Sequence, residues 1–317
     1  MRVLITGGTG SLGSALVAHW MPDPEVSRIV VYSRDEVKQG VLAARTRDPE
    51  NKLRFFLGDV RDADRLRDVM ATVDTVIHTA ALKRVDQVSY NPDEVLKTNI
   101  LGTWNVLRVA REVRCRRVLM ISSDKAVQPI NVYGASKLMG EFLTIRSNVL
   151  SVPRGTLASV LRYGNVWDSR GSVVEVFRRQ VAHKQPLTVT DPCMTRFFVT
   201  LAHAVTLVDR ALQWMVGGEV FVPKLRAWSL DQVARFFQPE YTEWTFTGLR
   251  AGGEKLHESL MAERETERLV ERGPFYVILP ECHEWTDTYA WDQEPRVALT
   301  RYTSDSVPRV EDLSTLL

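Results

Sequence analysis

The N-terminal segment restricts the fold of this chain more than any other. An apolar run at residues 2–6 leads into a turn with glycines at positions 7, 10 and 13, and a helical pattern follows at residues 14–20. A strand, a glycine-rich turn and a helix in this order are typical of dinucleotide binding, because glycines let backbone N–H groups approach a pyrophosphate. The alternative is a purely structural turn. The expected cofactor contacts are Gly7, Thr9, Gly10, Ser11, Leu12 and Gly13.

Further apolar runs repeat this arrangement along the first half of the chain. Short runs at residues 28–32, 53–57, 75–78, 117–121 and 157–161 alternate with helical patterns at residues 63–71, 92–113 and 133–149. Alternating strands and helices predict an α/β fold with a Rossmann-type, doubly wound parallel sheet. We therefore expect a cofactor-binding domain over residues 1–165.

The regular alternation stops after residue 165. Helical patterns then appear at residues 173–182, 198–214 and 228–236, with short strands at residues 187–189 and 219–222. A glycine-rich loop at residues 250–255 should precede a further helix. This irregular half predicts a smaller α/β substrate-binding lobe, mainly residues 166–317, from which residues 198–222 return to the first domain.

The end of the second predicted strand bears on the identity of the cofactor. An acidic residue at this point usually binds the ribose of NAD, but this chain has Ser33 and Arg34 there, with Lys38 one helical turn further on. A hydroxyl and two cations favour the 2′-phosphate of NADP. The alternative is a solvated helix start. Other expected cofactor contacts are Asp59 and Val60, beside the adenine, and the loop residues Thr79 and Ala80.

The candidate catalytic residues lie at the end of the fifth predicted strand and in the helix after it. Tyr133 and Lys137 are one helical turn apart on one face, so that the ammonium can lower the pKa of the phenol and make it a usable base. This pair is typical of hydride transfer. Asp124 and Lys125 come just before it, at the edge of the sheet where ligands bind in doubly wound folds. A second acid and base beside a redox tyrosine indicate chemistry beyond oxidation.

Basic residues recur in the loops that should face the substrate. Lys83 follows the fourth predicted strand, and Arg170, Arg196 and Arg250 lie in loops of the second half. Arginine offers a planar fork of donors, so three loop arginines could surround a diphosphate. Each alone is better explained as a surface charge. Asn99, inside an apolar helical pattern, suits a role in supporting the active-site lysine.

Composition excludes several other classes of protein. The 317 residues are 44% hydrophobic and 25% charged with a net charge of +2, which is ordinary for a globular protein. No basic stripe predicts nucleic-acid binding, and no apolar run is long enough to span a membrane. The three cysteines are widely spaced and lack metal-ligand partners. We therefore expect a reduced, cytoplasmic protein without a signal peptide, a metal or a membrane anchor.

The chain resembles a known family in these motifs. It looks like an extended short-chain dehydrogenase/reductase, and within that class it is similar to the UDP-N-acetylglucosamine 4,6-dehydratases (5-inverting). The resemblance covers nearly the whole chain and rests on TGGTGSLG (residues 6–13), YSRDEVKQ (32–39), FFLGDVRD (55–62), AALK (80–83), SSDKAVQPINVYGASKL (122–138), RYGNV (162–166), SRGSV (169–173), MTRF (194–197), FVPK (221–224) and GEKLHE (253–258). The D-K-A sequence upstream of the tyrosine is its specific part.

This resemblance implies a redox-neutral reaction. Tyr133 would take the proton of the sugar 4-hydroxyl while NADP accepts a hydride from carbon 4. Lys125 would then remove the proton from carbon 5, and Asp124 would protonate the departing 6-hydroxyl. For this role Lys125 must be neutral part of the time, which needs burial or a nearby positive charge. Lys137 would hold the nicotinamide ribose and tune Tyr133.

The resemblance also implies a substrate site and an assembly. The substrate would be a UDP-amino sugar, with contacts from Lys83, Asn165, Arg170, Ser172, Arg196, Arg250 and Glu254. Homo-oligomers, dimers or hexamers, would form through the helices at residues 92–113 and 133–149. The chain departs from the family pattern on the substrate side, at Arg84, Ser89, Ser123, Trp167 and Asp168 and in a loop at residues 250–255 that is one residue longer. The sugar could therefore differ from N-acetylglucosamine.

Two other functions remain open at this stage. A nucleotide-sugar 4-epimerase needs Tyr133 and Lys137 but has no need for Asp124 and Lys125. A non-catalytic, cofactor-binding scaffold needs none of the four. The intact set of four residues favours the dehydratase.

Overall fold

The computed structural model describes residues 1–151, 155–240, 245–250, 252–286 and 289–308. One large sheet forms its centre, with the strand order β13-β14-β10-β6-β5-β4-β1-β2-β3, in which β13 is Leu269–Arg272 and β14 is Phe275–Ile278. The parallel strands are β1 (Arg2–Thr6), β2 (Arg28–Ser33), β3 (Leu53–Leu57), β4 (Thr75–His78), β5 (Arg117–Ser123), β6 (Leu157–Tyr163) and β10 (Val220–Pro223). The predicted doubly wound parallel sheet is therefore confirmed.

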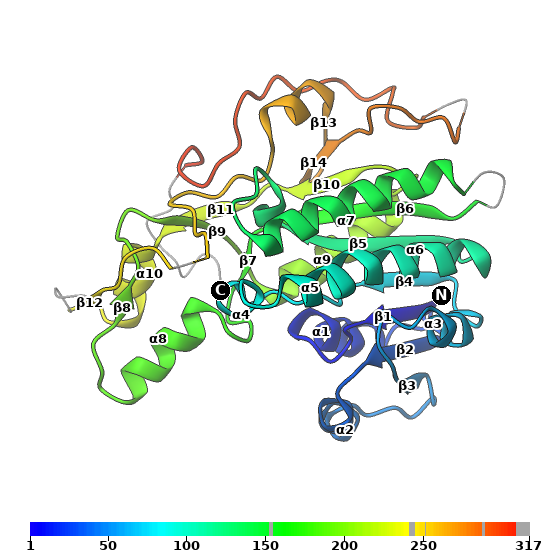
Figure 1. Cartoon of the computed structure of the whole chain (residues 1–317), viewed down its shortest axis with the longest axis horizontal. Helices are drawn as coiled ribbons and strands as arrows, with labels where there is room; N and C mark the ends of the chain where they lie inside the picture. The colour runs from blue at the N-terminus through cyan, green and yellow to red at the C-terminus, as the bar shows by residue number, and fades with distance from the viewer. Residues whose placement is uncertain (152–154, 241–244, 251, 287–288, 309–317) are drawn as a thin grey trace.

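Helices cover both faces of this sheet (Figure 1). One face packs against α1 (Ser11–Trp20), α2 (Glu36–Arg45) and α9 (Leu201–Trp214), and the other against α3 (Ala63–Met70), α6 (Gly102–Glu112) and α7 (Val132–Val149). Alternate strand residues supply the two cores: Val3 and Ile5 face α1, whereas Leu4 faces α3 and α6. This double burial explains why the strands read as continuous apolar runs.

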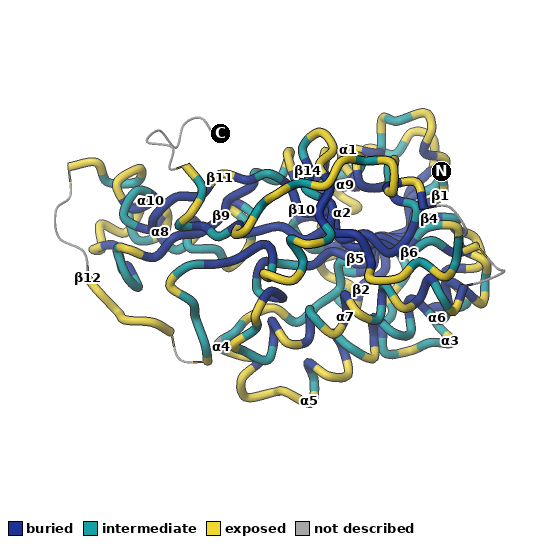
Figure 2. The backbone as a smooth tube through the Cα atoms, turned by 90° about the horizontal axis from the view of Figure 1, so that it is seen from above, coloured by how far each residue is buried: buried dark blue, intermediate teal, exposed yellow. Residues whose placement is uncertain are grey.

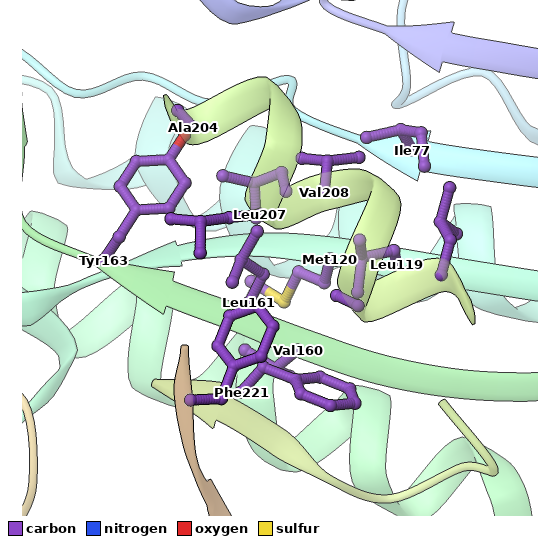
Figure 3. Close-up of a cluster of buried hydrophobic side chains, with 14 of the residues drawn as sticks. Ile77, Leu119, Met120, Val160, Leu161, Tyr163, Ala204, Leu207, Val208 and Phe221 are labelled. Atoms are coloured by element: carbon purple, nitrogen blue, oxygen red, sulfur yellow. The ribbon is translucent and has the colours of Figure 1, made fainter. Parts of the chain in front are cut away.

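Helix α9 shows how the second half of the chain returns to the sheet. Ala204, Leu207 and Val208 on α9 lie over Leu119 of β5 and Leu161 of β6 (Figure 3). The next strand, β10, pairs in parallel with β6. In Figure 2 the strands of the sheet are dark blue, and the exposed residues lie on the helices and loops around them. Among the described residues, no helix is both long and apolar enough to cross a bilayer.

Several predicted elements differ from the structure. The long helix at residues 92–113 is divided into α5 (Pro92–Val95), a π-helical turn (Leu96–Leu101) and α6. The helices predicted from residues 198 and 228 begin later, at Leu201 in α9 and at Leu230 in α10 (Leu230–Phe237), because the preceding residues belong to β9 (Thr195–Val199) and β11 (Arg226–Ser229). Among the described residues, no helix directly follows the loop at 250–255; a 3-10 helix, Glu263–Arg268, occurs further on.

Among the strands that were not predicted, two belong to the large sheet. β13 (Leu269–Arg272) and β14 (Phe275–Ile278) form an antiparallel hairpin, and β14 pairs with β10 at one edge of the large sheet. Both lie within the segment that the sequence analysis assigned mainly to the substrate lobe. The division at residue 165 remains a prediction.

A smaller lobe lies to one side of the sheet (Figure 1). It contains β7 (Asn165–Val166), α8 (Val173–Ala182), β8 (Thr188–Val189), β9, β11, α10 and β12 (Thr245–Phe246). A separate apolar cluster that includes Trp167, Phe177 and Trp228 holds it together. The lobe thus has a core of its own beside the Rossmann-type sheet.

A buried arginine connects the sheet, a helix and the C-terminal region. Arg162 in β6 is 1% exposed, and its guanidinium donates to both carboxylate oxygens of Glu141 in α7 and of Glu265 in the 3-10 helix. Arg162 also donates to the carbonyl of Leu260. A buried charge without partners is very costly, so these bonds determine where three distant segments meet.

We predict that Arg162→Met lowers the free energy of unfolding by about 3–5 kcal/mol, because it leaves two buried carboxylates without their cation. Urea unfolding followed by circular dichroism measures the change. Arg235→Met is the control, since Arg235 forms an exposed pair with Asp231 and should cost about 0.5 kcal/mol or less. Equal losses in the two variants would contradict the prediction.

Candidate active site

The glycine-rich turn between β1 and α1 has the shape of a dinucleotide cradle. Gly7 has a φ of 66°, and a Cβ there would lie 2.9 Å from the backbone of Ala80. A Cβ on Gly13 would lie 2.5 Å from the Cα of Gly8. Gly10 caps α1 without a side-chain hydrogen bond. The first N–H groups of α1 are therefore available to an anion such as a pyrophosphate.

The other residues predicted for this turn have different environments. Thr79 Oγ1 donates to the carbonyl of Thr6 at 2.7 Å, which places Thr79 and Ala80 directly beside Gly7. The Thr9 carbonyl and the Ser11 hydroxyl accept hydrogen bonds from Arg170. Leu12 is buried in the core below the loop. The structure thus brings all of these residues to one place, with the Leu12 side chain facing the core.

The predicted phosphate-binding cations lie just after β2 and in the first turn of α2. Arg34 Nη1 is 3.4 Å from the Asp59 carboxylate, and Lys38 pairs with Asp35 at 2.6 Å. Both cations are more than half exposed. The Ser33 hydroxyl accepts from Gln39 Nε2 at 3.0 Å. Val60, the neighbour of Asp59, is buried against α6, where a Cβ on Gly102 would lie 2.6 Å from its Cγ2.

Asp124 and Lys125 form an ion pair at the carboxyl end of β5, in which the acid is buried and the lysine is partly exposed. Asp124 is completely buried, and its Oδ1 accepts hydrogen bonds from Ser123 Oγ at 2.8 Å and from Lys125 Nζ at 2.9 Å. Lys125 Nζ also donates to Asn165 Oδ1 at 3.1 Å. The pair lies in a 3-10 turn, Asp124–Ala126, which directs both side chains to one side. This brings Asn165, from the start of the lobe, into contact with Lys125.

Tyr133 lies close to this pair, in the first turn of α7. Burial raises the pKa of Tyr133 to about 12, since it penalises the phenolate, and the charge of Asp124 adds to this increase. Lys125 is the main influence that lowers it. The sequence analysis expected this influence from Lys137, on the same helix as Tyr133; Lys125, in the 3-10 turn after β5, is a further cation that exerts it.

Lys137 itself is held below the site. Its Nζ donates to the carbonyl of Ile121 at 2.8 Å, and the side chain is 4% exposed. Burial lowers the pKa of Lys137 to about 8, partly offset by Glu141. A fully buried histidine, His78, hydrogen-bonds Thr6 and Thr103 nearby, and burial lowers its pKa to about 3, so that it is neutral.

Asn99 supports the loop that carries Lys83 and does not contact Lys137 directly. Its amide exchanges two hydrogen bonds with the backbone of Leu82, at 2.8 and 2.9 Å, and donates to Ser136 Oγ, next to Lys137. The π-helical turn places this amide toward the sheet. Lys83 stays exposed, and partial burial together with the charges of Arg170 and Lys125 lowers its pKa. Lys83 therefore lies near both Arg170 and Lys125.

Of the three loop arginines, Arg170 binds the glycine-rich turn, whereas Arg196 and Arg250 share a carboxylate. Arg170 contacts the glycine-rich turn, and it lies in the loop before Ser172, which caps α8. Arg196 is 4% exposed and donates to the carbonyls of Thr195, Lys255 and Leu256. Both Arg196 and Arg250 pair with Glu254, at 3.4 and 2.5 Å. These arginines outweigh the effect of burial and lower the pKa of Glu254.

One charged residue of this site was missed. Glu258 is 3% exposed, and its Oε1 lies 3.4 Å from Lys125 Nζ. It belongs to the GEKLHE motif, but its position more than a hundred residues after Lys125 gave no signal that the two meet. Burial and Arg196 lower the pKa of Lys125, whereas Asp124 and Glu258 raise it and prevail. The neutral amine required by the sequence analysis is therefore not the resting form.

The described residues contain no group of three or more histidine, cysteine, aspartate or glutamate side chains that could hold a metal ion. The site is built instead from a glycine-rich cradle, a buried tyrosine and lysine on one helix, and an acid and amine at the end of a strand. The doubly wound sheet and this site define an extended short-chain dehydrogenase/reductase, the class that includes nucleotide-sugar dehydratases and epimerases.

Within that class the chain belongs to the family described as "Polysaccharide biosynthesis protein", which matches residues 3–280. A Campylobacter jejuni protein named UDP-N-acetylglucosamine 4,6-dehydratase (inverting) is 39% identical over 88% of this chain and 83% of its own length. A Rickettsia bellii protein named UDP-glucose 4-epimerase is 37% identical over 99% of this chain and 94% of its own. The resemblance inferred from the motifs is confirmed.

Solved structures agree with this assignment. The X-ray structure of Pen from Bacillus thuringiensis matches this fold with a TM-score of 0.90 and 32% sequence identity. The match covers 98% of this chain and 93% of Pen. The architecture described above, including the lobe, is therefore shared with Pen over nearly its full length.

Proposed function

We propose that this protein is a nucleotide-sugar 4,6-dehydratase that converts UDP-N-acetylglucosamine to UDP-2-acetamido-2,6-dideoxy-L-arabino-hexos-4-ulose, with inversion at carbon 5. The observation that carries this proposal is the pair of the buried Asp124 and the partly buried Lys125 beside Tyr133, with its 2.9 Å hydrogen bond. Removal of a carbon-bound proton and departure of a hydroxyl need a base and an acid in addition to the tyrosine. The 39% identity to the dehydratase from Campylobacter jejuni supports the same reaction and substrate.

The residues have separate roles in this proposal. A bound nicotinamide would accept the hydride of carbon 4 and return it to carbon 6. Tyr133 takes the proton of the 4-hydroxyl, and the nearby charge of Lys125 favours its ionised form. Lys125 removes the proton from carbon 5, which the ketone at carbon 4 has made acidic. Asp124 passes the proton that Tyr133 took from the 4-hydroxyl to the departing 6-hydroxyl, which leaves as water. Lys137 would hold the ribose of the bound cofactor.

A second candidate is a UDP-sugar 4-epimerase, which the 37% identity to the Rickettsia bellii protein favours. An epimerase would use Tyr133 and Lys137 in the same way. It has no step in which Asp124 and Lys125 act as acid and base. A third possibility, a non-catalytic cofactor-binding scaffold, would leave the whole pair without a use.

We predict that Lys125→Met abolishes dehydration but not oxidation at carbon 4. In deuterated water without added nicotinamide, the wild type should release one water from UDP-N-acetylglucosamine and incorporate deuterium at carbon 5, detected by mass spectrometry and proton NMR. The dehydration rate of the variant should be at least about 100-fold lower than that of the wild type, because a positioned base typically contributes that much or more.

The control for this experiment is Lys224→Met, which removes a partly exposed lysine paired with Glu271 and should leave the rate unchanged. An unchanged mass with a new 4-epimer in the wild type would identify an epimerase. No change with any UDP-sugar, despite cofactor binding, would favour the scaffold. The coupling constants at carbon 5 of the product distinguish inversion from retention.

We also propose that the cofactor is NADP. Arg34 and Lys38 are exposed at the end of β2, beside the Ser33 backbone, and each is now paired with an acid that a phosphate could replace. Arg34→Ala should weaken NADP binding about tenfold or more and leave NAD binding unchanged, since a charge-assisted hydrogen bond contributes about 1.5–3 kcal/mol. Calorimetric titration of cofactor-free protein measures both affinities, with Arg45→Ala as the control. An equal loss for NAD and NADP would contradict the assignment.

We further propose that two chains associate through α6 and α7, which pack side by side. Met139 and Phe142 on α7 and Leu96 and Leu101 in the π-helical turn are exposed apolar side chains on these elements. Such exposed apolar residues on paired helices are typical of an interface. The assembly would be a dimer, or a hexamer built from dimers.

Phe142→Glu should reduce the mass of the assembly in solution to that of one chain, because a charge would be buried at the proposed interface. Size-exclusion chromatography with light scattering measures the mass. Phe246→Glu is the control, since Phe246 is equally exposed but lies in the lobe. A wild type that already has the mass of one chain would exclude the proposal.

A further inference from the structure

Lys125 is enclosed by two carboxylates rather than one. Asp124 precedes it in the chain, and Glu258 approaches from the C-terminal half with its Oε1 3.4 Å from Lys125 Nζ. The backbone of Glu258 is fixed at both ends, because its N–H donates to Ser304 Oγ at 2.9 Å and its carbonyl accepts from Ser304 N at 2.8 Å. A carboxylate held in this way has a defined position beside the amine.

The two carboxylates differ in how their charge is stabilised. Asp124 Oδ1 accepts hydrogen bonds from both Ser123 and Lys125. Glu258 Oε2 is buried and has no hydrogen-bond partner among the described residues, although the Lys255 ammonium lies 3.7 Å away. A buried oxygen without a hydrogen bond is costly as part of an anion. Glu258 therefore has unused capacity to accept a proton.

The proposed reaction creates a need for such an acceptor. Lys125 must be neutral when it attacks the proton on carbon 5, yet its two acidic neighbours favour the ammonium. Release of the proton to water becomes difficult once a bound sugar covers the site. A proton that moves within the cluster avoids this difficulty, because it neutralises both charges and leaves the net charge unchanged.

We propose that Glu258 is a positioning residue that accepts the proton of the Lys125 ammonium when substrate is bound; this rests on the dehydratase function proposed above. One N–H bond of Lys125 breaks and one O–H bond forms on Glu258, so that an ammonium and a carboxylate become a neutral amine and a neutral carboxyl group. The electron pair left on Nζ then takes the carbon 5 proton and restores the ammonium. Glu258 supplies no atom to the sugar.

The other charges around Lys125 are consistent with this transfer. Arg196 lowers the pKa of Lys125, and Lys83 and Lys255 are cations within its electrostatic reach. The charge of Asp124 instead raises the pKa of Lys125. Asn165 accepts a hydrogen bond from Nζ whether the amine is charged or neutral, and Tyr133 is uncharged near neutral pH because burial raises its pKa. The three cations repel the ammonium form of Lys125 and so favour its neutral amine.

The test is the pH dependence of deuterium incorporation at carbon 5 in the wild type and in Glu258→Gln. With internal transfer, the wild-type rate should be nearly independent of pH between about 6.5 and 8.5, because the proton content of the pair does not change. In Glu258→Gln the amine must lose its proton to solvent. Its rate should be at least about tenfold lower near pH 7 and should rise about tenfold per pH unit.

Two further variants separate this role from a structural one. Glu219→Gln is the matched control, since Glu219 is also a buried carboxylate but is bound by Ser159 and Trp291 outside the site; it should keep the wild-type pH profile. Glu258→Asp retains a proton acceptor and should restore a flat profile at a reduced rate. A flat profile in Glu258→Gln would overturn the proposal and would assign the proton to Asp124. A wild-type rate that rises tenfold per pH unit would overturn it as well.

A second readout does not depend on turnover. The titration of Lys125, followed by NMR of carbon-13-labelled lysine and assigned with the Lys125→Met variant, should move to lower pH in Glu258→Gln, because removal of a neighbouring anion disfavours the ammonium. An unchanged titration would overturn the proposal even if the dehydratase is active. If the Lys125 titration moves as expected in Glu258→Gln but the wild type leaves UDP-N-acetylglucosamine unchanged, the proposed function is refuted instead.

Discussion

The buried arginine of β6 is the interaction on which the geometry of the site depends. Arg162 binds Glu141 in α7 and Glu265 in the C-terminal region, so that one guanidinium connects three segments distant in sequence. Each of these segments carries part of the site: Tyr133 lies on α7, Asn165 follows β6, and Glu258 precedes Leu260, whose carbonyl Arg162 also binds. If this triad changed its position, the distances around Lys125 would change with it.

The sheet could be predicted from sequence because its signals are local. Each parallel strand is a short apolar run that ends at a turn, and the glycine spacing from Gly7 to Gly13 requires close backbone contacts that the structure contains. The hairpin β13–β14 was missed because its strands, Leu269–Arg272 and Phe275–Ile278, are short and follow a polar 3-10 helix rather than an amphipathic α-helical pattern. The π-helical turn at Leu96–Leu101 was also missed, since one additional residue per turn leaves no clear trace in an apolar pattern.

The site was predictable where chemistry follows from neighbours in the chain. Asp124 and Lys125 are adjacent, and Tyr133 and Lys137 share a helix face, so their grouping could be inferred directly. The charge state of Lys125 could not, because it depends on Glu258, which reaches the site only through the tertiary fold. Arg196 and Arg250 illustrate the same limit: sequence indicated loop cations, but the structure pairs both with Glu254.

The contact between Arg170 and the glycine-rich turn has a consequence for how long each ligand stays bound. Arg170 belongs to the segment between β7 and α8, yet it donates to the Thr9 carbonyl and the Ser11 hydroxyl of the cofactor cradle. A dinucleotide bound to that turn would be covered by the lobe segment between β7 and α8. A catalyst that returns its hydride in every cycle has no need to exchange its dinucleotide. In such a catalyst a covering segment gives the two ligands different residence times. The sugar nucleotide binds and dissociates in each turnover, whereas the dinucleotide stays bound for many turnovers.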